Sequence, residues 1–195
     1  MIRKICVYCG SNPGNRPDYI DAARRLAGVL VEKGIDLVYG GAGVGIMGAI
    51  ASTVMEKGGH VTGIMPEGLV EKEIAHPSLS EMHVVGTMHE RKALMADLAD
   101  GFIAMPGGLG TSEELFEVWT WAQLGMHEKP CGLFNVCGYY NPLVSFLDHA
   151  TAEGFISPTH RGMLIVESDP GKLLEQFKIY QAPRAKNWIE RALKN

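Results

Sequence analysis

The 195-residue sequence has no run of about 18 consecutive apolar residues, the length that a membrane-spanning helix needs. Residues 1–8 lead directly into a strand-like pattern, without the charged, apolar and small-residue regions of a signal peptide. We therefore expect neither a signal peptide nor a membrane anchor, and no membrane partner.

The sequence also lacks an excess of basic residues. Lys and Arg number 18 against 22 Asp and Glu, so the formal net charge is −4. Nucleic acids and acidic lipid surfaces are bound mainly through basic patches. The charge balance therefore argues against a nucleic-acid partner, while it still allows a small local basic pocket.

Cysteines are few, and of the four only Cys6 and Cys9 have the short spacing of metal knuckles and redox motifs. Side chains alternate along a strand, so these two thiols should face opposite sides of a sheet. Cys131 and Cys137 do not supply a second metal knuckle. We expect structural, reduced thiols and, because such thiols are typical of reducing compartments, a cytoplasmic location.

No Pro-rich or Ser-rich linker, internal repeat or low-complexity segment divides the chain. Its length is usual for one domain, and a hydrophobic content of 46% suffices for one core. We therefore predict a single domain over residues 1–195. Residues 184–195 are compatible with a short amphipathic helix that packs on this domain or on a second copy.

Seven short apolar runs alternate with helix-length amphipathic segments; the runs are 5–8, 37–39, 61–65, 83–86, 102–105, 132–134 and 164–166. Runs without a polar face suit strands that are buried on both sides. The segment from Asp18 to Lys33 has one apolar helical face, and Gly34 is typical of a helix end. This alternation predicts an α/β fold with a doubly wound, mostly parallel sheet flanked by helices, which is a Rossmann-like arrangement.

Two strand-to-helix connections are rich in glycine, and in open parallel sheets ligands bind beyond the carboxyl ends of the strands. The first connection contains Gly43-Val-Gly-Ile-Met-Gly48, which matches the dinucleotide fingerprint, and Glu67 follows at about the expected 20 residues. The same glycines also fit a tight turn with close helix packing and no ligand. A dinucleotide-dependent oxidoreductase is therefore one hypothesis for this loop.

The second connection, residues 106–111, favours an anion. Gly107, Gly108 and Gly110 allow backbone amides to converge, and a helix that begins near Thr111 adds unpaired amides and the positive end of its dipole. No Walker lysine follows, which argues against a nucleotide triphosphatase. The alternative is a capping box, because Thr111 and Glu114 have the T-x-x-E spacing.

The segment Pro106-Gly-Gly-Leu-Gly-Thr-Ser-Glu-Glu114 resembles the PGGxGTxxE motif of the Lonely Guy proteins, the cytokinin-activating phosphoribohydrolases. Cys9-Gly-Ser11, residues 39–48 and Met88-His-Glu-Arg-Lys92 resemble other signatures of that family in the same order, so the similarity covers nearly the whole chain. It implies a Rossmann-like homodimer that hydrolyses the N-glycosidic bond of N6-modified adenosine monophosphates or AMP. The products would be free base and ribose 5-phosphate.

The resemblance implies that Arg91 and Glu114 are the catalytic pair. It also implies a set of substrate- and phosphate-binding residues, namely Ser11, Gly40, Gly41, Met88, Lys92, Gly107, Gly108, Leu109, Gly110 and Thr111. The helices around Leu94 and residues 119–124 are candidates for the dimer contact, and they equally fit an ordinary core.

No cofactor or metal is expected. The seven histidines lack metal-ligand spacing such as HExxH. Many relatives are labelled lysine decarboxylases, but that reaction needs pyridoxal phosphate on a lysine, and no lysine here has a convincing cofactor setting. The main alternative to an enzyme is a nucleotide or molybdenum-cofactor carrier, because a fold does not imply catalysis.

Overall fold

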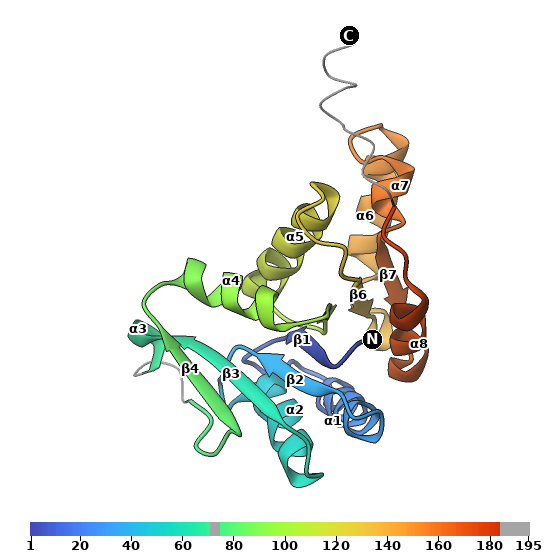
Figure 1. Cartoon of the computed structure of the whole chain (residues 1–195). Coiled ribbons are helices and arrows are strands. Elements are labelled where there is room, and N and C mark those ends of the chain that lie inside the picture. The colour runs from blue at the N-terminus through green and yellow to red at the C-terminus, as the bar shows by residue number, and fades with distance from the viewer. Residues whose placement is uncertain (71–74, 184–195) are drawn as a thin grey trace.

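The computed structural model describes residues 1–70 and 75–183 (Figure 1). Seven strands form one sheet: β1 (Lys4–Tyr8), β2 (Asp36–Tyr39), β3 (Val61–Pro66), β4 (Glu81–Val85), β5 (Gly101–Ala104), β6 (Cys131–Phe134) and β7 (Leu164–Glu167). They lie in the order β4-β3-β2-β1-β5-β6-β7, and each neighbouring pair is parallel. The seven predicted strands are confirmed, with small shifts at their ends.

Helices cover both faces of the sheet (Figure 1). They are α1 (Pro17–Glu32), α2 (Gly45–Glu56), α3 (Glu67–Val70), α4 (Met88–Leu98), α5 (Leu109–Gln123), α6 (Asn141–Ala152), α7 (Pro158–Arg161) and α8 (Pro170–Ile179), with a 3-10 helix η1 (Val136–Gly138). The predicted helix before Gly34 is confirmed as α1, and Gly34 has the left-handed φ of 64° that ends it. The helix predicted for residues 184–195 lies outside the described residues.

Two hydrophobic clusters, one on each face of the sheet, form the core. α1, α2 and α8 pack on one face, whereas α4, α5 and α6 pack on the other. Along β1 and the residue that follows it, the side chains alternate between the clusters, so Cys9 belongs to the first cluster and Cys6 to the second. This confirms that the two thiols face opposite sides, and all four cysteines are free. Burial raises the pKa of the Cys131 thiol to about 12, so that thiol stays neutral.

The order of the strands creates a switch point beside β1. From β1 the chain winds outward to β4, and β5 then returns to the other side of β1. The carboxyl ends of β1 and β5 are tied by hydrogen bonds from Gly10 N to Pro106 O (3.1 Å) and from Met105 N to Tyr8 O (2.9 Å). Open α/β sheets bind ligands at such a point, and the second glycine loop begins there.

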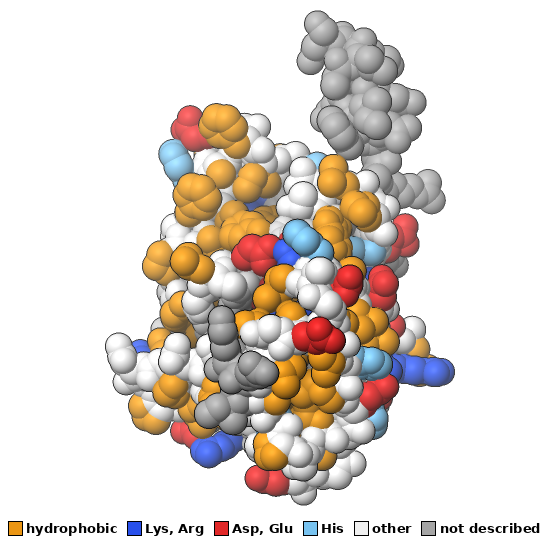
Figure 2. Space-filling view, turned by 90° about the vertical axis from the view of Figure 1, so that its left-hand side faces the viewer, with side chains coloured by type: hydrophobic (Ala, Val, Ile, Leu, Met, Phe, Trp, Pro, Cys, Tyr) orange, Lys and Arg blue, Asp and Glu red, His pale blue; other side chains and the backbone are white. Residues whose placement is uncertain are grey.

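The surface over α4 and β4 has mixed polarity. Figure 2 shows this face, on which hydrophobic side chains lie among charged ones. Val84 and Met88 are exposed apolar residues of these two elements. Within the described ranges, no helix is both long and apolar enough to cross a bilayer.

Candidate active site

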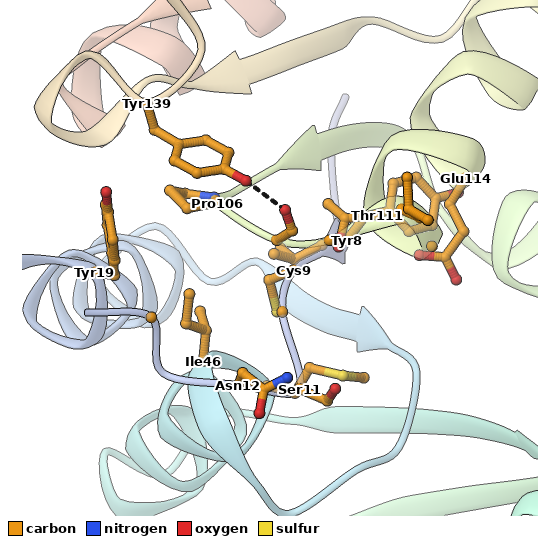
Figure 3. Close-up of a pocket in the computed structure, with 18 of the residues that line it drawn as sticks. Tyr8, Cys9, Ser11, Asn12, Tyr19, Ile46, Pro106, Thr111, Glu114 and Tyr139 are labelled. Carbon is orange, nitrogen blue, oxygen red and sulfur yellow. Dashed lines mark hydrogen bonds between the residues drawn. The ribbon is translucent and has the colours of Figure 1, made fainter. Parts of the chain in front are cut away.

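A cleft of about 490 Å³ lies at the switch point (Figure 3). This size is within the range of small-molecule sites. It brings together eight residues that the sequence predicts for the site, namely Ser11, Arg91, Gly107, Gly108, Leu109, Gly110, Thr111 and Glu114. Figure 3 shows Glu114 at the opposite end of the cleft from Tyr19, with Thr111 nearer the middle. The other four predicted residues lie outside the lining.

The second glycine loop, residues 106–111, packs tightly at one position and is open at another. A Cβ on Gly107 would lie 2.1 Å from Thr111 Oγ1 and 2.9 Å from Gly10 N, so only glycine fits. A Cβ on Gly108 would meet nothing within 4 Å. Gly108 is the N-cap of α5 and supplies no side-chain cap, and helix geometry leaves the next three amides without intrahelical partners. The loop therefore presents amides and the positive end of a helix dipole to the cleft.

The capping-box interpretation of Thr111 and Glu114 is wrong. α5 begins at Leu109, three residues earlier than that interpretation requires, so Thr111 lies inside the first turn. The T-x-x-E cap is instead at the start of α4, where Thr87 Oγ1 accepts a hydrogen bond from Glu90 N at 3.1 Å. Glu114 extends to Arg91 and lines the cleft.

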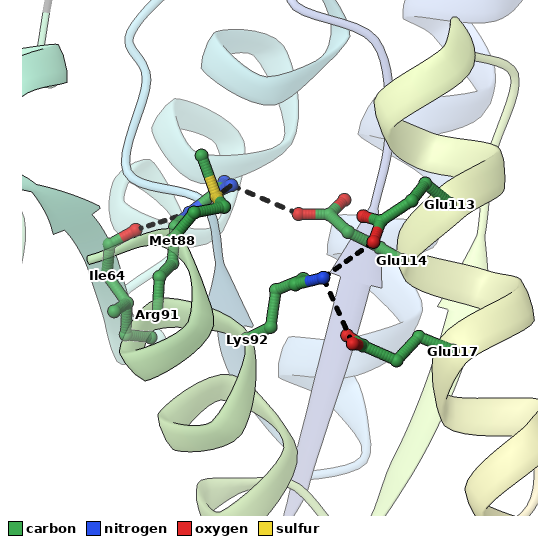
Figure 4. Close-up of polar contacts among 7 residues, drawn as sticks. All are labelled: Ile64, Met88, Arg91, Lys92, Glu113, Glu114 and Glu117. Carbon is green, nitrogen blue, oxygen red and sulfur yellow. Dashed lines mark hydrogen bonds and ion pairs between the residues drawn. The ribbon is translucent and has the colours of Figure 1, made fainter.

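Arg91 and Glu114 form an ion pair between α4 and α5 (Figure 4). Arg91 Nη1 lies 3.1 Å from Glu114 Oε1, and the two side chains are only 10% and 11% exposed. Arg91 Nε also donates to the carbonyl of Ile64 in β3, at 3.0 Å, and Nη1 contacts Met88 Sδ at 3.4 Å. These contacts fix the guanidinium in the cleft wall next to the carboxylate.

Gly40 and Gly41 lie in the turn after β2, next to this ion pair. A Cβ on Gly40 would lie 2.0 Å from Arg91 Nη2, so the missing side chain leaves room for the guanidinium. Gly41 has a left-handed φ of 86°, and its carbonyl accepts a hydrogen bond from His76 N at 3.0 Å. Gly40 and Met88 thus lie against Arg91, whereas Gly41 shapes the turn after β2. A direct contact with substrate stays a prediction for all three.

Lys92 lies beside the pair and binds two carboxylates of α5 (Figure 4). Its Nζ is 2.5 Å from Glu113 Oε1 and 3.0 Å from Glu117 Oε1, and its side chain is 9% exposed. The hydrogen bond to Glu113 is the main cause that raises the pKa of Lys92, so the ammonium stays protonated. Lys92 therefore ties α4 to α5, and its predicted contact with substrate is untested.

The first glycine loop, residues 40–48, packs against protein at the positions of the dinucleotide fingerprint. A Cβ on Gly45 would lie 2.2 Å from Ser11 O, and one on Gly48 would lie 2.3 Å from Gly43 O. The first amides of α2 are also in use, because Ile46 N and Met47 N both donate to the Gly10 carbonyl, at 3.1 and 3.2 Å. These contacts confirm the tight turn and the close packing that the glycines were expected to allow.

Sequence reasoning missed several residues of the cleft wall, among them Asn12, Tyr19 and Tyr139. Tyr139 comes soon after β6, whose carboxyl end lies beside that of β5. Because ligands of open parallel sheets bind beyond the carboxyl ends of the strands, this position is a signal that could have identified Tyr139. Cys9 also lines the cleft. Burial, reinforced by the charge of Glu114, raises the pKa of the Cys9 thiol far above its ordinary range, so Cys9 is a neutral wall residue.

Comparison with known proteins gives relatives of two kinds. In sequence, a cytokinin riboside 5'-monophosphate phosphoribohydrolase from Arabidopsis thaliana is 52% identical over 178 residues, which are 91% of this chain and 84% of the relative. A probable enzyme of the same name from Oryza sativa subsp. japonica is 49% identical over 184 residues, which are 94% of this chain and 75% of the relative.

In structure, the molybdenum cofactor carrier protein of Chlamydomonas reinhardtii has a TM-score of 0.67 and 19% identity, and the match covers 92% of this chain and all of that one. The molybdenum cofactor binding protein of Rippkaea orientalis has a TM-score of 0.67 and 23% identity, over 91% of this chain and 96% of that one. Identities this low show a shared fold and no more.

A family model described as a possible lysine decarboxylase matches residues 47–177, which include the Arg91 and Glu114 pair and the second glycine loop. Half of the residues are identical to the phosphoribohydrolases over most of both chains. The chain therefore belongs to the Lonely Guy family of phosphoribohydrolases.

Proposed function

We propose that the protein hydrolyses the N-glycosidic bond of adenosine 5'-monophosphates, N6-modified or plain, and releases the free base and ribose 5-phosphate. The observation that carries this proposal is one cleft that holds both the start of α5, which has no side-chain cap, and the Arg91 and Glu114 pair. The relatives that are about half identical to the chain are named for this reaction. No cofactor enters the proposal.

The phosphate of the substrate binds at the second glycine loop. The amides at the start of α5 point outward from the helix, and the Thr111 hydroxyl lies in the same turn. Several hydrogen bonds and the helix dipole then offset the phosphate charge without a lysine. With the phosphate fixed there, the ribose extends along the cleft toward Glu114, which lies one turn further along α5.

Glu114 acts on the sugar. Cleavage of a ribosyl–base bond builds positive charge on the sugar, and a carboxylate beside that centre stabilises the charge. The same carboxylate can orient or deprotonate the attacking water, or attack the sugar itself. Arg91 places the carboxylate by its 3.1 Å contact.

Arg91 anchors and stabilises charge, and it does not serve as the proton donor. A guanidinium stays charged in proteins, which makes it a poor general acid. Its fixed position beside Glu114 suits hydrogen bonds to ribose or phosphate oxygens. We expect Arg91→Ala to raise KM and lower kcat, each at least about tenfold. Steady-state kinetics near the wild-type values would contradict this role.

A decarboxylase is disfavoured by the state of Lys92. A Schiff base requires a neutral amine, whereas Glu113 and Glu117 hold Lys92 as an ammonium with a raised pKa. Incubation with pyridoxal phosphate and lysine should yield neither the visible absorbance of a Schiff base nor cadaverine.

The experiment that tests the proposed function is a chromatographic assay of base release from AMP, isopentenyl-AMP and the two matching nucleosides. Release from the monophosphates and not from the nucleosides is the expected result, because only the monophosphates carry the anion. The faster monophosphate identifies the preferred base. No base from any of the four would overturn the reaction and leave a nucleotide or molybdenum-cofactor carrier as the alternative.

We also propose a homodimer in the cytoplasm. Near the predicted contact, Trp119 is core, since it is 5% exposed and donates to His160 O, whereas Leu124 and Met126 are 45% and 68% exposed. These two exposed apolar side chains at the end of α5 support a contact with a second copy. Light scattering after gel filtration should give twice the chain mass of 21.2 kDa, and a monomer at all concentrations would contradict it. Four free cysteines are consistent with a reducing compartment.

A further inference from the structure

The loop after β6 places two consecutive tyrosines against the second glycine loop. The Tyr139 hydroxyl donates to Gly107 O and the Tyr140 hydroxyl donates to Met105 O, both at 2.6 Å. We propose that Tyr139 is a positioning residue for the substrate phosphate, because its hydrogen bond holds the Gly107–Gly108 peptide with the Gly108 amide directed toward the anion. This inference rests on the proposed function.

The loop that carries these tyrosines is tightly built. Cys137 and Gly138 both have left-handed backbones, with φ of 51° and 71°, which turns the chain sharply after η1 begins. Asn135 Oδ1 accepts a hydrogen bond from Tyr140 N at 2.8 Å, and Asn135 Nδ2 donates to Asn141 Oδ1 at 2.8 Å. These contacts fix the direction in which the tyrosines leave the loop.

The Tyr139 ring is also held from two sides. It makes edge contacts with the Tyr19 ring of α1, at 5.9 Å between centroids, and with the Tyr140 ring, at 5.0 Å. Figure 3 shows Tyr139 and Ser11 on opposite sides of the cleft, with Pro106 on the side of Tyr139. The hydroxyl therefore reaches the second glycine loop from the side opposite Ser11.

The hydrogen bond from Tyr139 matters because of the peptide that it holds. The Gly107–Gly108 peptide lies between two glycines, whose backbone torsions are the least restricted of any residue, so this peptide can rotate easily. In a planar trans peptide the carbonyl and the following amide point in opposite directions. Holding Gly107 O against Tyr139 therefore turns the Gly108 N–H away from Tyr139, toward the other side of the cleft.

Tyr140 offers a matched comparison. Its hydroxyl makes a bond of the same length, but the peptide that it holds joins Met105 to Pro106. Proline has no N–H, so this peptide presents no donor to an anion whichever way it turns. Tyr140 is 4% exposed and outside the cleft lining, whereas Tyr139 is 41% exposed and within it. The two hydroxyls should therefore differ in function although their bonds are alike.

A direct contact between Tyr139 and the phosphate is a weaker explanation. A phenol has a single proton, and that of Tyr139 is donated to Gly107 O. Towards a phosphate the oxygen would then present only lone pairs, and two acceptors repel. Tyr139 thus acts through the loop.

The test compares wild type, Tyr139→Phe and Tyr140→Phe, which each lose one hydroxyl and keep the ring. For Tyr139→Phe we expect KM for AMP to rise about three- to tenfold, the range of one net hydrogen bond, with kcat within about twofold. Calorimetry should show ribose 5-phosphate binding weakened by the same factor and adenosine binding unchanged. For Tyr140→Phe we expect a lower Tm and a KM close to that of wild type, because its hydroxyl is buried.

An unchanged KM together with unchanged ribose 5-phosphate binding in Tyr139→Phe would overturn the proposal. So would an equal loss of affinity for ribose 5-phosphate and for adenosine in that variant, or the same rise of KM in Tyr139→Phe and Tyr140→Phe. Failure of the proposed function has a different signature, since wild type would then release no base from AMP. Even in that case, the binding of ribose 5-phosphate to wild type and to Tyr139→Phe can be compared. If wild type does not bind ribose 5-phosphate at all, this inference is overturned as well.

Discussion

The two glycine loops flank β1, one after β2 and one after β5, and they differ in where their helix amides point. In the first loop, the amides of Ile46 and Met47 donate to the Gly10 carbonyl. In the second loop, the N-cap Gly108 has open space beside it, and the start of α5 lines the cleft. A glycine-rich turn therefore indicates an anion site only if no protein carbonyl already occupies the end of the helix.

The largest expected effect concerns Glu114 on α5, the helix that follows the second glycine loop. Glu114→Gln keeps the size of the side chain and removes its charge, so we expect kcat to fall by about a hundredfold or more. The matched control is Glu113→Gln, a neighbouring and exposed carboxylate that pairs with Lys92, for which we expect a change within about threefold. A loss of less than about tenfold for Glu114→Gln, measured as base release from AMP, would contradict its assigned role.

The first loop should affect the reaction through Arg91. In Gly40→Ala the new methyl group would displace the Arg91 guanidinium and Met47 Cε, which lie 2.0 and 2.5 Å from its position. Because small displacements of catalytic groups are costly, we expect kcat to fall about ten- to a hundredfold. The control is Gly28→Ala on α1, where a Cβ meets only Lys57 at 3.7 Å. Equal kinetics for the two variants would show that Arg91 tolerates the displacement.

A pair of identical substitutions separates the loops most directly. Gly108→Ala adds a methyl group in open space at the cleft, so we expect a KM for AMP about tenfold higher and an unchanged Tm. Gly45→Ala forces a left-handed φ of 59° on alanine and a clash with Ser11 O, so we expect a loss of stability of about 1–3 kcal/mol. Thermal denaturation should therefore show a lower Tm for Gly45→Ala, and steady-state kinetics should show a higher KM for Gly108→Ala. Similar losses of Tm in both variants would contradict the difference between the two loops.

The smallest expected effect is that of a chelator. The positive charge in the cleft comes from the amides of α5 and from Arg91, so the proposed hydrolysis needs no divalent ion. Base release from AMP should be unchanged after dialysis against EDTA. Activity that disappears on dialysis and returns with a divalent cation would contradict this prediction.

Much of the fold and part of the site were predictable from local patterns. The seven strands follow from short apolar runs, and Gly34 marks the end of α1. The T-x-x-E spacing was ambiguous, because Thr87 and Thr111 both begin such a pattern and only the first caps a helix. Where a helix starts depends on the preceding turn and its tertiary contacts, and at α5 Gly107 packs against Gly10.

The sequence by itself determined the parallel α/β sheet, and it predicted an anion site at residues 106–111 and Arg91 with Glu114 as site residues, which the structure brings into one cleft. These follow from periodicity, from glycine and helix-end chemistry, and from a specific motif. Only the tertiary structure decided that Gly40 makes room for Arg91, that Lys92 holds two glutamates, and that Tyr139 holds Gly107. Each of these contacts joins segments far apart in the chain, and their distances depend on how the strands are ordered in the sheet.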